Sequence, residues 1–88
     1  MKTNFLMLRE LLEKYHPKTR GFVSSEESEL IKTALHLKEM NVLALRNLRD
    51  FTVLFISSKE NDIRENWDKL SAITFVIDLE ILNKGEEV

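Results

Sequence analysis

The side chains best suited to metal chemistry are few in this chain and far apart. It contains two histidines, His16 and His36, and no cysteine. A zinc site needs three or four His, Cys or carboxylate ligands held close together, often at short sequence spacing. Neither histidine has such neighbours, so the sequence predicts no metal site.

Serines and carboxylates are also explained without catalysis. The pairs Ser24-Ser25 and Ser57-Ser58 each precede glutamates in the capping-box pattern that begins a helix, and neither lies in a Gly-x-Ser-x-Gly elbow. The acidic residues of 26–29 and 60–68 fall at the same expected helix starts, where the helix dipole favours negative charge. With only two glycines there is no phosphate-binding loop. We therefore expect no catalytic residue, no cofactor and no enzyme activity.

Basic side chains form two groups that are relevant to nucleic acids, one in the segment 14–20 and one on the third expected element. They are Lys14, Lys18, Arg20, Arg46 and Arg49. A basic arm can grip phosphates, and a helix-turn-helix with helices at 25–38 and 42–50 would present the second group. The net charge of −2 and a turn without glycine weigh against this interpretation. Nucleic-acid binding is the alternative prediction.

Charge is distributed unevenly along the chain. Residues 1–23 contain five basic and two acidic side chains, a local charge of +3, whereas residues 60–88 contain three basic and eight acidic ones, a local charge of −5. Opposite charge at the two ends can steer partners or attract a second copy of the chain.

Apolar residues exceed what a small monomer buries easily, chiefly over residues 42–56. On a helical wheel Leu43 and Leu54 fall among polar residues, away from the main apolar stripe. Contiguous exposed apolar surface usually marks an interface, and tryptophan is enriched at binding hot spots. We predict a protein interface at Leu43, Leu54 and Trp67, and a homodimer, because cyclic dimers are the commonest assembly.

Four helices are expected to position these residues. Apolar spacing predicts helices over 4–16, from Ser24 to about Met40, from Val42 to about Ile56, and from the second capping box to about Lys84. Pro17, Asn41 and Gly85 are the expected breaks. The sequence thus predicts an all-α fold, a small four-helix bundle.

An α+β fold is the alternative, because two segments also carry strand patterns. Phe51–Ser57 is rich in residues that strands favour, and apolar and polar residues alternate over Thr74–Leu82. Two strands there would enclose a helix at Asp62–Ala72, a strand-helix-strand unit at 51–82 packed on two N-terminal helices. The capping boxes, the scarcity of glycine and proline, and the lack of a hairpin turn signal favour the bundle.

Length and composition limit the remaining possibilities. Eighty-eight residues suit a single domain, 1–88, with 1–3 and 86–88 frayed. No apolar run resembles a signal peptide or a membrane span, and the absence of cysteine suits a reducing cytoplasm. The sequence predicts a cytoplasmic adaptor or regulatory or inhibitory module that docks on another protein as a homodimer.

Overall fold

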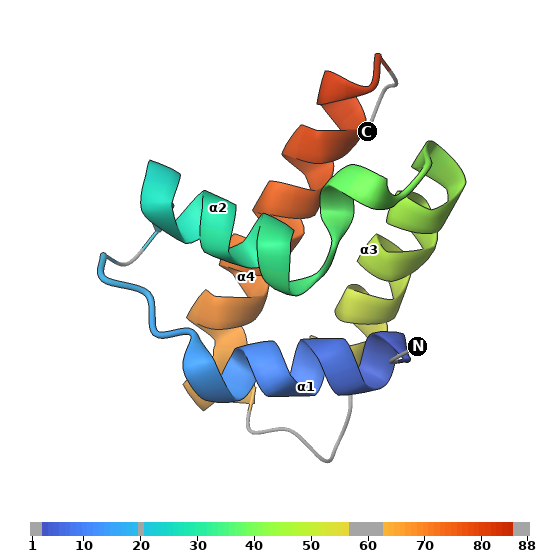
Figure 1. Ribbon diagram of the computed structural model, residues 1–88. Coiled ribbons are helices and arrows are strands. Elements are labelled where there is room, and N and C mark those ends of the chain that lie inside the picture. The colour runs from blue at the N-terminus through green and yellow to red at the C-terminus, as the bar shows by residue number, and fades with distance from the viewer. Residues whose placement is uncertain (1–2, 20, 57–62, 86–88) are drawn as a thin grey trace.

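The computed structural model describes residues 3–19, 21–56 and 63–85. These residues form four α-helices and one short 3₁₀ helix (Figure 1): α1 (Asn4–Lys14), α2 (Ser25–Ala34), η1 (Leu37–Glu39), α3 (Val42–Ile56) and α4 (Ile63–Asn83). Over the described ranges there is no strand, and the one pair of bridge residues is Thr19 with Phe22. The prediction of a small all-α bundle is confirmed.

The α+β alternative is wrong. Residues 51–56 continue α3 and residues 74–82 lie within α4, while Ser57 falls outside the described residues. The alternation over 74–82 coexists with a helical stripe of Leu70, Ile73, Ile77 and Ile81, all fully buried. Because that stripe begins before the alternation and buries one complete face of a helix, it determines the structure of the segment.

Side-chain caps fix the helix starts. The Thr3 hydroxyl accepts a hydrogen bond from the Leu6 N–H at 3.2 Å, and the Asn41 side chain accepts one from the Ala44 N–H at 2.8 Å. Ser24 and Glu27 form the predicted capping box. The second predicted box, residues 57–60, lies outside the described residues.

Two helices end earlier than predicted. The first stops at Lys14 rather than His16, because Tyr15 is already extended ahead of Pro17. The second stops at Ala34 rather than near Met40, and His36 then takes a left-handed conformation with φ 55° and ψ 39°. In a continuous helix Leu35 and Leu37 would point in nearly opposite directions. The break allows both to be fully buried.

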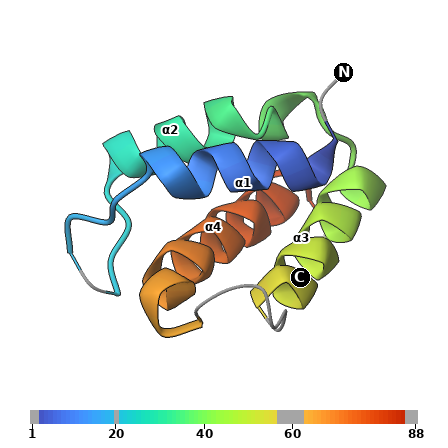
Figure 2. The same ribbon diagram turned by 90° about the horizontal axis from the view of Figure 1, so that it is seen from below.

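Helix α4 is the centre of the molecule. It runs antiparallel to α3, while α1 and α2 lie across one side of the α3–α4 pair (Figures 1 and 2). Its 21 residues span about 31 Å at 1.5 Å per residue, close to the longest dimension of 33 Å. It packs on α1, α2, η1 and α3, so all the described helices share one core.

Two polar contacts tie helices together across this core. The Lys69 ammonium of α4 donates a hydrogen bond to the Leu12 carbonyl oxygen at the end of α1, at 2.7 Å. The Arg49 guanidinium of α3 lies 3.6 Å from the Asp78 carboxylate of α4.

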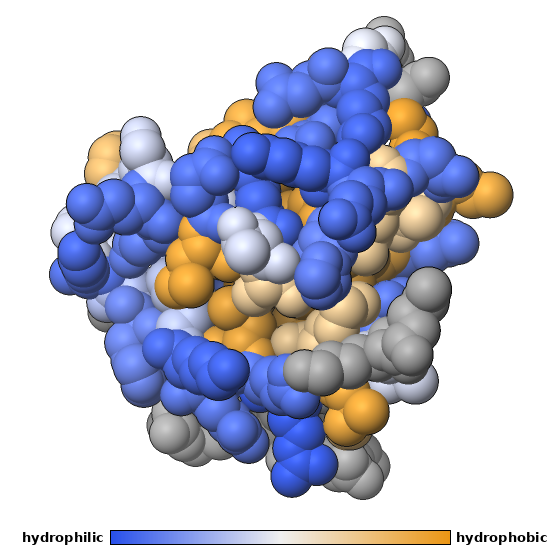
Figure 3. Space-filling model, viewed as in Figure 1, coloured by the Kyte–Doolittle hydropathy of each residue, from blue (hydrophilic) through white to orange (hydrophobic). Residues whose placement is uncertain are grey.

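On the face seen in Figure 3, hydrophobic surface gathers in the middle of the molecule, surrounded by hydrophilic side chains.

Candidate functional site

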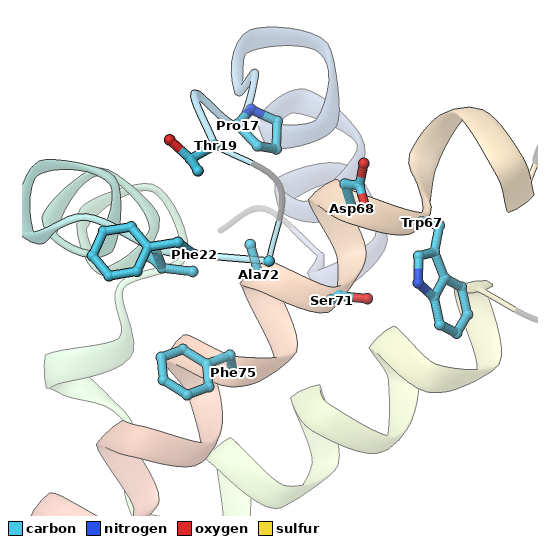
Figure 4. Close-up of a pocket in the computed structure, with 10 residues that line it drawn as sticks. Pro17, Thr19, Phe22, Trp67, Asp68, Ser71, Ala72 and Phe75 are labelled. Carbon is cyan, nitrogen blue, oxygen red and sulfur yellow. The ribbon is translucent and has the colours of Figure 1, made fainter.

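Three aromatic side chains surround a hollow of about 400 Å³ on the solvent-facing side of α4. Phe22 is 63% exposed, Trp67 51% and Phe75 52%. Figure 4 shows Phe22 and Phe75 towards one side and Trp67 towards the other, with the small side chains of Ser71 and Ala72 between them. The hollow is lined by Pro17, Thr19, Gly21, Phe22, Val23, Trp67, Asp68, Ser71, Ala72 and Phe75.

A second hollow of about 280 Å³ continues the first along α4. The two share Val23 and Phe75, and the second extends to Leu79 and to the first turns of α2, including Ser28. From Trp67 to Leu79 the combined surface, hereafter the aromatic groove, follows α4 for about 18 Å. The first hollow is lined mainly by apolar side chains, and the serines at the start of α2 with Glu29 and Lys32 give the second a polar edge.

Helical spacing explains why α4 presents this face. Trp67, Ser71, Phe75 and Leu79 recur every four residues, on the side opposite the buried stripe of 70, 73, 77 and 81. The core contacts of α4 therefore hold these side chains in place from behind without covering them.

Glu27 holds the loop that forms the other wall of the groove. Its carboxylate accepts hydrogen bonds from the Lys18 N–H and the Ser24 N–H, both at 2.9 Å, and the side chain is buried. These two donors lower the pKa of Glu27 despite its burial. Because Lys18 and Ser24 are the two ends of the loop that carries Phe22, one buried side chain fixes both ends of that wall.

Tyr15, which follows α1, belongs to the core and is 1% exposed. Burial raises the pKa of its phenol, and the nearby Glu27 carboxylate raises it further. Among the described residues its hydroxyl has no hydrogen-bond partner. A buried hydroxyl in this state costs free energy and offers nothing to the groove.

Of the three predicted interface residues, one lines the aromatic groove. Trp67 lines the aromatic groove, whereas Leu43 and Leu54 lie on the exposed side of α3, 68% and 69% exposed, and line neither hollow. Phe22 and Phe75 were not among the predicted interface residues. The signal for Phe75 is its spacing of eight residues from Trp67, off the buried stripe. No sequence signal brings Phe22 to α4.

The predicted nucleic-acid contacts are also dispersed. Lys14 is exposed at the end of α1, and the Lys18 ammonium lies 3.3 Å from the Glu26 carboxylate. Arg49 is an ion-pair partner of Asp50 at 3.7 Å as well as of Asp78.

The other two predicted nucleic-acid contacts are Arg46 and Arg20, and the prediction also included a helix-turn-helix at 25–38 and 42–50. Arg46 is half-buried on α3, and Arg20 lies outside the described residues. The predicted first helix of the helix-turn-helix, 25–38, ends at Ala34, and residues 35–41 separate α2 from α3.

Metal ligands and membrane spans were also considered over the part of the chain that is described. There, no three His, Cys or acidic side chains gather closely enough to hold a metal ion. None of the described helices is long and apolar enough to cross a bilayer.

Comparison with known proteins gave no matching family model, no matching curated protein and no matching solved structure.

Proposed function

We propose that this domain is a protein-docking module with an adaptor or regulatory role, and that the aromatic groove holds an apolar segment of another polypeptide. The observation that carries the proposal is the placement of three half-exposed aromatic rings around one hollow. Tryptophan is enriched at protein binding hot spots, and phenylalanine is enriched at the cores of protein interfaces.

The size of the groove suits a helical segment. An amphipathic helix that lies in a groove uses apolar side chains at intervals of three and four residues, and about 18 Å accommodates three or four such positions. Small side chains at Ser71 and Ala72 leave room for a bulky anchor between the rings. The serines and charged groups along α2 supply polar partners at the edge.

The energy available is moderate. An aromatic side chain contributes about 150–250 Å² on burial, so these three rings expose on the order of 300 Å² together. Covering that area yields about 8 kcal/mol before the entropic cost of association, which is itself at least about 4 kcal/mol. We therefore expect binding that depends strongly on each ring.

Selection from a displayed library of helical peptides tests the proposal directly. Trp67 is the only tryptophan of the chain, so its fluorescence reports on the groove itself. Selected peptides should shift the Trp67 emission and should bind the Phe75→Ser variant about tenfold or more weakly. The matched control is Leu30→Ser, since Leu30 is 47% exposed and lines neither hollow.

Two results contradict the proposal. One is the absence of any enriched peptide, and the other is equal binding to Phe75→Ser and to Leu30→Ser. A role for Leu43 and Leu54 stays a separate prediction: peptides that lose affinity for Leu43→Asp or Leu54→Asp, and not for Phe75→Ser, identify α3 as the docking surface instead.

A further inference from the structure

We infer that the aromatic groove binds a second copy of this chain, with α4 of one copy antiparallel to α4 of the other and the two-fold axis at Phe75. This inference rests on the proposed function, since it requires that the groove binds a polypeptide. It goes further by identifying that polypeptide and its register.

The face of α4 that carries Phe75 allows a two-fold pairing centred on that residue. Helix geometry places Ser71 and Leu79, four residues away, and Asp68 and Leu82, seven residues away, on the same face as Phe75, with Trp67 next to Asp68 at one end. An antiparallel partner related by a two-fold axis reads the same series in reverse. With Phe75 on the axis, Ser71 faces Leu79 of the other copy and Asp68 faces Leu82, so the two stripes coincide along about 21 Å.

Side-chain size is complementary in this register. Phe75 meets its own symmetry mate, and the small Ser71 faces the larger Leu79 of the other copy. Large side chains placed opposite small ones let two helices approach closely and interdigitate. Ser71 is exposed and Leu79 is half-buried, so both are accessible from the groove.

Charge is complementary as well. Asp68 lies near the start of α4, and Lys84 lies just beyond its end, two residues past Leu82. The antiparallel register therefore brings each Lys84 within reach of Asp68 of the other copy, twice by symmetry. A carboxylate accepts several hydrogen bonds, so this contact is compatible with any other that Asp68 makes. Antiparallel helix dipoles favour the same orientation.

The exposed area matches half of an ordinary dimer interface. A standard interface buries about 800 Å² per partner, of which about 57% is nonpolar, or roughly 450 Å². The three aromatic rings provide on the order of 300 Å² of this. Leu82, which is 52% exposed, and the accessible edge of Leu79 account for most of the remainder.

Absolute mass by size-exclusion chromatography with light scattering is the first test, over a wide range of concentration. We expect a dimer whose dissociation constant rises about tenfold or more in Leu82→Ser. The same substitution at Leu30, 47% exposed and outside the groove, should leave the constant unchanged. Far-UV circular dichroism verifies that both variants remain folded. A monomer at every concentration, or equal effects of the two variants, overturns the inference.

Disulfide trapping tests the register. The chain has no cysteine, so Ser71→Cys and Leu79→Cys each introduce a single thiol. A mixture of the two variants should form the mixed disulfide under oxidation well ahead of either variant alone, because only the 71–79 pair faces across the axis. Within one helix these positions lie about 12 Å apart, too far for a disulfide. Preferential 71–71 disulfides would instead show a parallel or shifted pairing and overturn the register.

Charge exchange supplies an independent check. Asp68→Lys or Lys84→Glu alone should weaken the dimer at low salt, and the double variant should restore it, because the two charges exchange places across the axis. If the double variant does not restore the dimer, the contact between Asp68 and Lys84 is contradicted.

The two proposals can fail separately. If the chain is monomeric but the binding of selected peptides still depends on Phe75, the second copy is excluded and the docking function stands. If no peptide binds either, both proposals fail.

Discussion

Glu27 accepts backbone hydrogen bonds from both ends of the loop that carries Phe22. Because its carboxylate is buried and bonded to two backbone N–H groups, Glu27 stabilises the loop conformation. The shape of the groove wall therefore depends on a side chain that does not line the first hollow.

We expect Glu27→Gln to lower the free energy of unfolding at neutral pH by about 1–3 kcal/mol, because an amide nitrogen must then face a backbone N–H. The pKa of Glu27 is lowered in the folded state, so the carboxylate stabilises the fold above its ordinary value of 4.5. That contribution disappears as the pH falls through the lowered pKa.

Urea unfolding at a series of pH values measures this effect. The difference between wild type and Glu27→Gln should shrink as the pH falls below about 4. Glu26→Gln is the control, since the Glu26 side chain is 85% exposed and should show little difference at any pH. A difference for Glu27→Gln that stays constant with pH contradicts the prediction.

Ionisation of Tyr15 makes the free energy of unfolding depend on pH in the alkaline range as well. Because burial and the Glu27 carboxylate penalise the ionised phenol, the raised pKa of Tyr15 leaves the free energy of unfolding unaffected below about pH 10 and lowers it as the pH rises from there through the raised pKa. Tyr15→Phe should remove the alkaline loss and should leave the stability at neutral pH unchanged or raised by up to about 1 kcal/mol, because the buried hydroxyl is unsatisfied.

Tyr15 is the only tyrosine, so tyrosinate absorbance follows its ionisation directly. In Glu27→Gln the pKa of Tyr15 should fall towards its ordinary value, because one of the two causes of the rise is removed. If Tyr15→Phe lowers the free energy of unfolding by more than about 1 kcal/mol, the Tyr15 hydroxyl instead makes a hydrogen bond that stabilises the fold.

The α3–α4 pair is the largest contact between the described helices, and an ion pair between Arg49 and Asp78 joins the two helices. Both side chains are partly withdrawn from water, with 24% and 30% exposed, and one oxygen of Asp78 is buried without a hydrogen bond. Arg49 therefore contributes to the packing of α3 on α4 through its ion pair with Asp78.

Arg49→Met should lower the free energy of unfolding by about 1–2 kcal/mol, because it leaves the partly buried Asp78 carboxylate without this cation. Adding Asp78→Leu should recover much of that loss. Asp50→Asn is the control, since Asp50 is the other partner of Arg49 and its side chain is 70% exposed. Equal losses in the single and double variants would mean that packing of the arginine stem, not the charge pair, is what matters.

Helix starts and stripes were predictable from the sequence, since a cap and its partner are three residues apart. Ser24 with Glu27 and Asn41 with Ala44 are such local pairs. The end of α2 was not predictable, because it depends on burying Leu35 and Leu37 against other helices. Likewise Trp67 was identifiable as a candidate anchor, but the presence of Phe22 across the same hollow depends on a loop held by Glu27 from α2.

At the scale of the whole molecule, acidic partners and net charge both weigh against nucleic-acid binding. Lys18 and Arg49 have acidic partners, and the net charge of the chain is −2. We expect no retention on heparin at low salt, as is usual for an acidic protein without a basic patch. Retention that is abolished in a Lys14→Glu, Lys18→Glu variant would favour the nucleic-acid alternative.

Helix α4 packs on every other described element, and its Lys69 reaches across 57 positions of sequence to the last turn of α1. During synthesis the ribosome releases α1, α2 and α3 before the residues that complete their shared core exist. The first helix cannot receive the bond to its Leu12 carbonyl until Lys69 has emerged. In the nascent chain the apolar faces of α1, α2 and α3 therefore stay exposed until α4 has been synthesised and packs on all three. Exposed apolar surface of this kind is what chaperones bind.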